Sequence, residues 1–149
     1  MKYIYYIFIF LFFNSNVPNS EIINDLRSFV NSDKNETLLI FHFNITGCVK
    51  CYIEPNDILI NLQKNNYLRN CKIIASVICD RDIELKIFAR DNNWKYSLYR
   101  NDGTLLSRLN AAKDTFITII TTKNEIVHFK PGNPKQNFDK IVELLSKSN

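Results

Sequence analysis

The hydrophobic positions of the chain fall into segments with two different periods. Apolar side chains recur at helical spacing in residues 21–31, 81–92 and 135–147. Residues 37–43 and 72–79 are instead almost continuously apolar and rich in β-branched and aromatic side chains, which is typical of buried central strands. Helices and strands therefore alternate over the first two thirds of the chain.

The region after residue 92 has the pattern of short strands and turns. Residues 95–99 predict a short strand, and residues 105–110 predict a short helix or turn. Residues 115–121 and 125–130 predict two strands, joined by a turn at Thr122-Lys123-Asn124. Alternating strands and helices followed by a hairpin predict an α/β fold, a three-layer sandwich with a mixed central sheet between helices.

The sequence predicts local details of two of the helices. A helix is expected from about residue 48 to residue 65, with a kink at Pro55. Its inner face would hold Ile58, Leu59 and Leu62. The helix over residues 81–92 is expected to be capped by Asp80. Its shared apolar face would hold Ile83, Ile87 and Phe88.

The N-terminal segment does not have the pattern of a domain element. Lys2 is followed by an unbroken apolar run from Tyr3 to Phe13, which is typical of a secretory signal and short for a membrane span of about 20 residues. A cleavage site after Ser20 is poorly defined because Pro18 stands where a small residue is preferred. We expect residues 1–20 to be a signal peptide or an uncleaved N-terminal membrane anchor and residues 21–149 to form one domain. The protein is then exported, to a periplasmic or other extracytoplasmic compartment.

The charge pattern argues against a nucleic-acid partner. The formal net charge is +4, and the basic and acidic residues alternate along the chain instead of forming a basic stripe.

Four cysteines remain beyond the N-terminal segment, and their spacing separates them into two pairs. Cys48 and Cys51 enclose only two residues, so a bridge between them would restrict the unfolded chain little, and such pairs are usually redox-active or metal-binding. Cys71 and Cys79 stand at the two ends of a predicted strand, about 26 Å apart, so they cannot bridge. Cys79 is either a third thiol near the first pair or an inert core cysteine.

The order of the predicted elements resembles the thioredoxin-like superfamily. A strand and a short loop lead to Cys48-Val49-Lys50-Cys51 at a predicted helix start, and βα, ββ and α follow. The longer section over residues 95–110 is most similar to exported redoxins of the TlpA and ResA type. In those proteins a D-x-x-G segment precedes the strand that carries the cis-proline, and Tyr99-Arg100-Asn101-Asp102-Gly103 is similar to it. Glu54, three residues after the second cysteine, also matches that branch. The resemblance covers most of residues 37–147.

The chain departs from the family pattern at three places. Gly47 occupies the position of the usual tryptophan before the motif, and Pro55 comes one residue earlier than the usual helix proline. The cis-proline expected before the strand at Thr115 is absent, since Lys113 and Asp114 stand there. By the resemblance, residues 113–115 would form the substrate-docking segment.

The resemblance implies thiol–disulfide oxidoreductase chemistry, which needs no cofactor. Cys48 would be the nucleophile, with its thiolate stabilised by a helix N-terminus and by Lys50. Cys51 would be the resolving thiol that closes the Cys48–Cys51 disulfide. His42 stands where thioredoxins have a buried acid that takes the resolving proton, and a neutral imidazole is able to do the same. Alternatively, His42 is a satisfied core histidine, and Glu54 is the proton acceptor or only a solvated helix residue.

The expected partners are cysteine-containing exported proteins and an upstream redox partner. Two alternatives use the same fold. One is a metal-binding or metal-delivery module based on Cys48, Cys51 and His42. The other is a non-catalytic binding domain, which the missing proline favours. His128, on the predicted hairpin, has no expected role in the chemistry.

Overall fold

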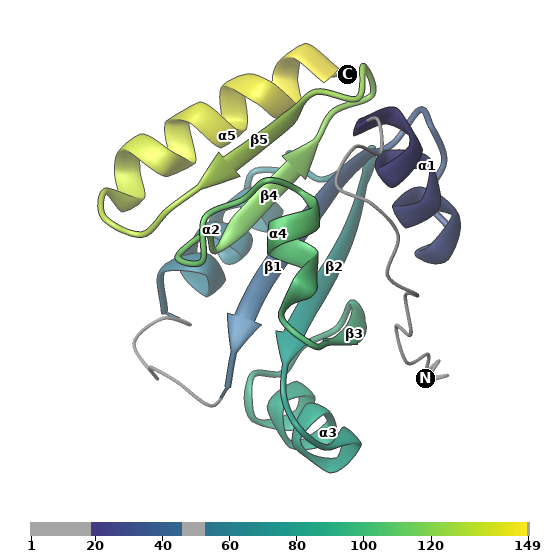
Figure 1. The fold of residues 1–149 in the computed structure, drawn as a ribbon. Coiled ribbons are helices and arrows are strands. Elements are labelled where there is room, and N and C mark those ends of the chain that lie inside the picture. The colour runs from purple at the N-terminus through teal and green to yellow at the C-terminus, as the bar shows by residue number, and fades with distance from the viewer. Residues whose placement is uncertain (1–18, 46–52, 149) are drawn as a thin grey trace.

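The computed structural model describes residues 19–45 and 53–148, which form one sheet flanked by helices (Figure 1). The helices are α1 (Asn19–Phe29), α2 (Ile53–Lys64), α3 (Asp82–Asp91), α4 (Thr104–Arg108) and α5 (Pro134–Ser148). The strands are β1 (Thr37–Asn44), β2 (Cys71–Ile78), β3 (Ser97–Asn101), β4 (Ile117–Ile120) and β5 (Ile126–Phe129). The predicted α/β class and element order are confirmed.

The sheet is mixed, with strand order β3-β2-β1-β4-β5. The first three strands in this order are parallel, and β4 and β5 run antiparallel to their neighbours. The strand register defines the edge of the sheet at which β1 ends: Asn44 lies beside Ile78, and Phe41 lies beside Ile117. The carboxyl ends of β1 and β2 and the start of β4 therefore meet at one edge of the sheet.

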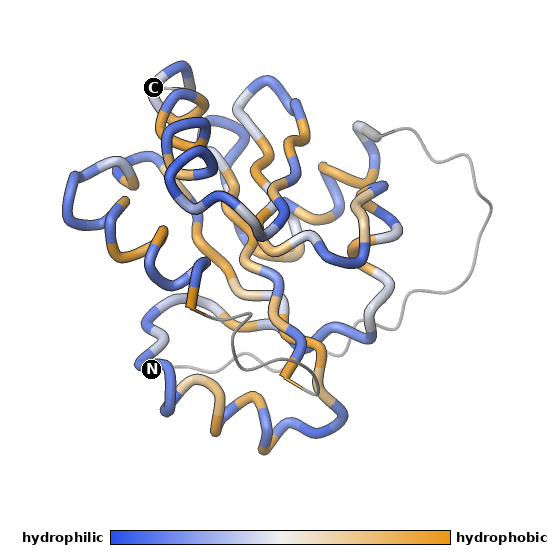
Figure 2. The backbone as a smooth tube through the Cα atoms, turned by 90° about the vertical axis from the view of Figure 1, so that its left-hand side faces the viewer, coloured by the Kyte–Doolittle hydropathy of each residue, from blue (hydrophilic) through white to orange (hydrophobic). Residues whose placement is uncertain are grey.

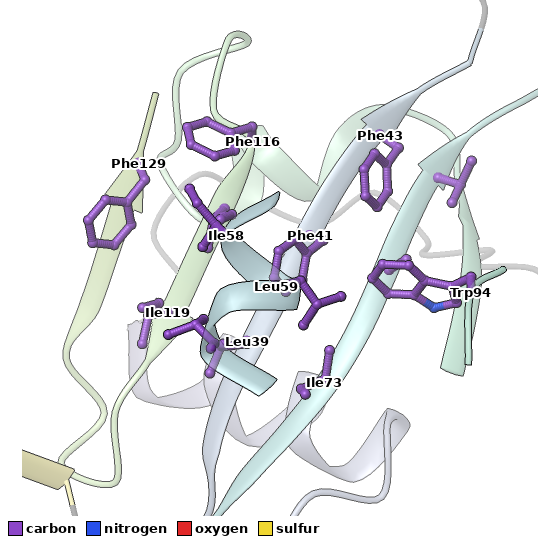
Figure 3. Packing of buried hydrophobic residues seen from close by; sticks show 14 of the residues in the cluster. Leu39, Phe41, Phe43, Ile58, Leu59, Ile73, Trp94, Phe116, Ile119 and Phe129 are labelled. Carbon is purple, nitrogen blue, oxygen red and sulfur yellow. The ribbon is translucent and has the colours of Figure 1, made fainter. Parts of the chain in front are cut away.

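The larger core fills the face of the sheet that packs against α2, α3 and α5. Figure 3 shows part of this core, with Ile58 and Leu59 of α2 over the strand residues. Leu39, Phe41 and Phe43 alternate along β1 and point into this layer, where Trp94 meets the two phenylalanine rings edge-on at centroid distances of 5.8 Å and 5.6 Å. The chain is most hydrophobic along these central strands, and its outer turns are hydrophilic (Figure 2). Burial of all residues of β1 except the last, Asn44, explains its nearly continuous apolar sequence.

The opposite face is covered by α1 and α4. Ile23, Leu26 and Val30 of α1 and the following turn pack on Leu38 and Ile40, which are the alternate residues of β1. His42, two residues further along β1, belongs to this same face by its position. This side of the sheet therefore changes from apolar to polar as it approaches the carboxyl edge.

The expectations for α3 were wrong in two respects. Arg81, not Asp80, is the N-cap residue, and its backbone N–H donates to the Glu84 carboxylate at 3.1 Å. The buried side chains are Leu85, Phe88 and Ala89, while Ile83 and Ile87 are exposed. Both apolar sets have helical spacing, so periodicity alone does not select the buried one.

Pro55 is buried at the third position of α2 as the structure describes it. A proline in the first turn removes an N–H that has no acceptor within the helix, so this position tolerates it. The part of the predicted helix before Ile53 lies outside the described residues.

Asparagine ends four of the helices. Asn31, Asn66, Asn93 and Asn110 follow α1 to α4, and all have a positive φ between 47° and 59°. In each case the next residue donates its N–H to a carbonyl five residues earlier, as in Ser32 to Arg27 at 2.9 Å. This is the Schellman arrangement, in which glycine usually takes the left-handed position. The chain has only three glycines, and asparagine replaces glycine at these helix ends.

Arg27 ties α1 to two other segments of the fold. The residue is 3% exposed, and its guanidinium group donates to the carbonyls of Asp33, Glu36 and Thr121 at 2.8–2.9 Å. Burial lowers the pKa of Arg27, and the nearby Glu36 and Asp33 carboxylates partly offset this effect. The loop after α1 and the end of β4 are thus held together by one buried side chain.

Within residues 19–45 and 53–148, no helix has the length and apolar character needed to cross a bilayer. The first described helix begins at Asn19, two residues before the predicted domain boundary.

Candidate functional site

The candidate site lies at the edge of the sheet where β1 ends. From there the chain continues through the Cys48-Val49-Lys50-Cys51 segment and returns at α2. Residues 46–52 lie outside the described residues, so the roles assigned to Cys48, Lys50 and Cys51, and their disulfide, stay predictions. The surrounding residues are described, and they define what a thiol pair at this connection would meet.

His42 is the polar side chain of β1 closest to this edge among its buried residues. Its Nε2 lies 2.8 Å from Thr118 Oγ1, and its Nδ1 is buried without a hydrogen-bond partner. Burial, followed by the nearby His128, lowers the pKa of His42 to about 3. The side chain is therefore neutral near pH 7 and only half satisfied, which differs from the expected alternative of a satisfied core histidine.

Thr118 and His128 extend the polar contact of His42 across the sheet. Thr118 Oγ1 lies 3.0 Å from His128 Nδ1, and His128 Nε2 lies 3.0 Å from the carbonyl oxygen of Leu109. Thr118 is fully buried, whereas His128 is half-buried. Sequence reasoning assigned His128 no role, because its link to His42 through Thr118 depends on sheet pairing between distant segments.

A second polar pair lies on β2 and β3. Asn101 Nδ2 donates to Ser76 Oγ at 2.9 Å, and both residues are buried. Ser76 is the β2 neighbour of His42 in the register of the sheet. Five residues from five strands thus form a polar band near the carboxyl edge of the sheet: His42, Ser76, Asn101, Thr118 and His128.

Glu54 is bound to the other end of the chain. Its carboxylate accepts from Asn137 Nδ2 at 3.0 Å and from the Gly132 N–H at 3.3 Å. These contacts join the first turn of α2 to the start of α5, and Glu54 is half-buried between them. Glu54 is therefore an anchor between two helices, and its action as a proton acceptor stays a prediction.

Residues 113–115 lead into β4 at the same edge. Lys113 and Asp114 are exposed, and Asp114 pairs with Lys130 at 3.1 Å. Thr115 is buried, and its Oγ1 has no hydrogen-bond partner. The next residue, Phe116, accepts the backbone N–H of His42 at 2.9 Å, so this segment runs directly beside the end of β1. Its role in substrate docking stays a prediction.

Cys71 and Cys79 are free thiols at opposite ends of β2, as their spacing predicts. Cys79 lies buried at the carboxyl edge, where burial, followed by Glu84, raises its pKa. Burial and Glu36 raise the pKa of Cys71 to about 11. Raised pKa values keep both thiols protonated and therefore poorly nucleophilic. Among the described residues, no group of three metal-ligating side chains is present.

Comparison with solved structures identifies the class of fold. A thioredoxin-family thiol:disulfide interchange protein from Chlorobium tepidum matches 80% of this chain and 84% of its own, with 15% identity and a TM-score of 0.59. A secreted Mycobacterium tuberculosis disulfide oxidoreductase homologous to E. coli DsbE matches 76% and 82%, with 10% identity and a TM-score of 0.56. A thioredoxin-like protein from Porphyromonas gingivalis matches 78% and 80%, with 20% identity and a TM-score of 0.56. The chain therefore has the thioredoxin-like fold.

No protein-family model and no curated protein sequence matches the chain.

Proposed function

We propose that this protein is an exported thiol–disulfide oxidoreductase that exchanges disulfides with protein cysteines through Cys48 and Cys51. The observation that carries the proposal is the position of the C-x-x-C motif in the chain. It occupies the connection between the central strand β1 and the helix α2 of a thioredoxin-like sheet. A C-x-x-C motif in this strand-to-helix context is the redox form of the motif.

The reaction consists of two successive thiol–disulfide exchanges. The Cys48 thiolate attacks a disulfide of the partner protein, which forms a mixed disulfide and releases one partner thiolate. Cys51 loses its proton and attacks the Cys48 sulfur, which closes the Cys48–Cys51 bond and releases the second partner thiolate. The partner gains two electrons and the motif loses two, and the same steps in reverse oxidise a dithiol.

The surroundings of the motif suit this chemistry. The two other cysteines have raised pKa values and lie in the sheet, so they compete poorly as nucleophiles. His42 presents an unpartnered, neutral nitrogen one residue from the last buried position of β1. A neutral nitrogen is able to accept the proton that Cys51 must lose.

Export is part of the proposal. It is supported by the apolar N-terminal run after Lys2, and one of the matched structures is of a secreted disulfide oxidoreductase. The expected substrates are exported proteins with cysteine pairs, and an upstream redox partner would return the motif to its starting state.

The proposal predicts that Cys48→Ser abolishes catalysed reduction of insulin disulfides in a dithiothreitol-coupled assay, because the attacking thiolate is lost. Cys71→Ala is the matched control, since Cys71 begins β2 at the end far from the motif, and it should keep full activity. Cys51→Ser should accumulate a mixed disulfide with the substrate. Equal activity of wild-type protein and Cys48→Ser would overturn the proposal.

A further inference from the structure

Three buried or half-buried side chains form one continuous line of hydrogen bonds on the α1 and α4 face. His42 Nε2 contacts Thr118 Oγ1 at 2.8 Å, and Thr118 Oγ1 contacts His128 Nδ1 at 3.0 Å. His128 Nε2 then contacts the Leu109 carbonyl at 3.0 Å, just after α4. The line begins at the unpartnered Nδ1 of His42 and crosses β1, β4 and β5.

The chemistry of the last acceptor determines where every proton in this line lies. The Leu109 carbonyl only accepts, so His128 carries a proton on Nε2. When His128 is neutral, its Nδ1 is an acceptor, and the Thr118 hydroxyl donates to it. The Thr118 oxygen then accepts from His42 Nε2–H, which leaves Nδ1 of His42 with a free lone pair.

One added proton reverses the two bonds of Thr118 without moving a heavy atom, while His128 Nε2–H continues to donate to the Leu109 carbonyl. If His128 is doubly protonated, its Nδ1–H donates to Thr118, and the Thr118 hydroxyl donates to His42 Nε2. The proton of His42 is then on Nδ1. The two arrangements differ by one proton, which enters at Nδ1 of His42 and appears as positive charge on His128.

We propose that His42, Thr118 and His128 form a proton relay between the buried Nδ1 of His42 and the half-buried ring of His128. This inference rests on the proposed function, because the resolving thiol is the source of the proton. His42 Nδ1 takes that proton, His42 Nε2 gives one to Thr118, and Thr118 gives one to His128 Nδ1. When the thiol is formed again, the three transfers run in reverse.

The relay explains how a deeply buried histidine accepts a proton at neutral pH. A cation confined to His42 is strongly disfavoured, since burial and the neighbouring His128 lower the pKa of His42 to about 3. On His128 the charge lies on a half-buried ring whose Nε2–H already donates to a carbonyl. The relay thus moves the charge to the better-stabilised ring.

Two basic residues flank the far end of the relay along the chain. Arg108 at the end of α4 precedes Leu109, and Lys130 follows β5 and is paired with Asp114 at 3.1 Å. His42 and His128 act on each other electrostatically. A titration of the relay therefore has to follow both rings together.

The first test reads the tautomers of both histidines by two-bond proton–nitrogen NMR correlation in the full chain. At neutral pH we expect both rings to carry the proton on Nε2. As acid protonates His128, the proton of His42 should move from Nε2 to Nδ1 with the same midpoint. A His42 tautomer that does not change while His128 titrates would overturn the relay.

Three variants separate the relay from a merely structural role. Thr118→Val removes the central hydroxyl and should break the coupling between the rings, while Thr118→Ser should keep it. Thr121→Val is the matched control, because Thr121 is a buried threonine of the same hairpin that bonds the Glu125 N–H outside the line. Coupled titration that survives in a folded Thr118→Val protein would also overturn the relay.

The second readout is the rate of disulfide exchange at neutral pH. Thr118→Val should slow it by about tenfold or more, in line with the loss of positioned proton transfer, whereas Thr118→Ser and Thr121→Val should not. Equal rates in Thr118→Val and wild type would contradict the catalytic use of the relay. If wild-type protein shows coupled tautomers but no exchange, the proposed function fails while the relay stands.

Discussion

His42 shows what a single buried polar residue contributes at the residue scale. It lies near the carboxyl edge of the central strand, and it has one hydrogen-bonded and one unpartnered nitrogen. Buried polar atoms without a partner are rare in folded proteins because each costs free energy. The cost is consistent with a function for the free nitrogen, and it also makes the residue sensitive to acid.

The lowered pKa of His42 predicts a specific pH dependence of stability. The unfolded chain binds a proton at this residue below about pH 6.5, while the folded protein binds it only near pH 3. The free energy of unfolding should therefore fall with decreasing pH, by about 2 kcal/mol between pH 7 and pH 5 from this residue alone. Urea unfolding at both pH values measures it.

Two variants check the origin of this loss. His42→Gln should have a shallower pH dependence by about the same amount. His128→Gln should keep most of the dependence, because burial is the larger cause of the lowered pKa. An unchanged slope in His42→Gln would contradict this explanation.

At the scale of elements, the helix ends explain part of the unusual composition of the chain. Four helices end with an asparagine in the left-handed conformation. A fifth asparagine of positive φ, Asn124, has a φ of 62° in the hairpin turn. Asparagine tolerates this region better than other side chains with a β-carbon. The many asparagines of the sequence therefore include residues that terminate helices in this fold.

Asn66, exposed after α2, allows a direct test of this role. Asn66→Ala should lower the free energy of unfolding by about 1 kcal/mol, because alanine pays more for a positive φ, and Asn66→Gly should be at least as stable as wild type. Asn61→Ala is the control, since Asn61 is exposed within α2 and alanine favours helix. Equal losses at both positions, measured by urea unfolding, would contradict the assignment.

The helices and strands also show which features of the fold were predictable from the sequence and which were not. The central strands β1 and β2 were predictable because their buried residues form long, nearly continuous apolar runs. The buried face of α3 was not, since its two apolar sets both have helical spacing. The contact between His42 and Thr118 was not predictable either, because it joins residues 76 positions apart and depends on the register of β1 and β4.

At the scale of the whole molecule, the sheet brings one edge of the protein together from distant segments. The end of β1, the buried Cys79 after β2 and the exposed pair Lys113 and Asp114 before β4 all belong to this edge. The first turn of α2 is fixed to the start of α5 through Glu54. The connection that carries Cys48 and Cys51 is thus anchored on both sides by described, well-packed elements.

The central claim is that Cys48 and Cys51 form a reversible redox pair while Cys71 and Cys79 do not take part. The most direct measurement is equilibration of the protein in glutathione buffers of graded potential, followed by alkylation of free thiols and peptide mapping by mass spectrometry. The predicted result is a single reversible two-electron transition that joins Cys48 to Cys51, with Cys71 and Cys79 alkylated throughout. A disulfide that includes Cys71 or Cys79, or the absence of any reversible transition, would contradict the account.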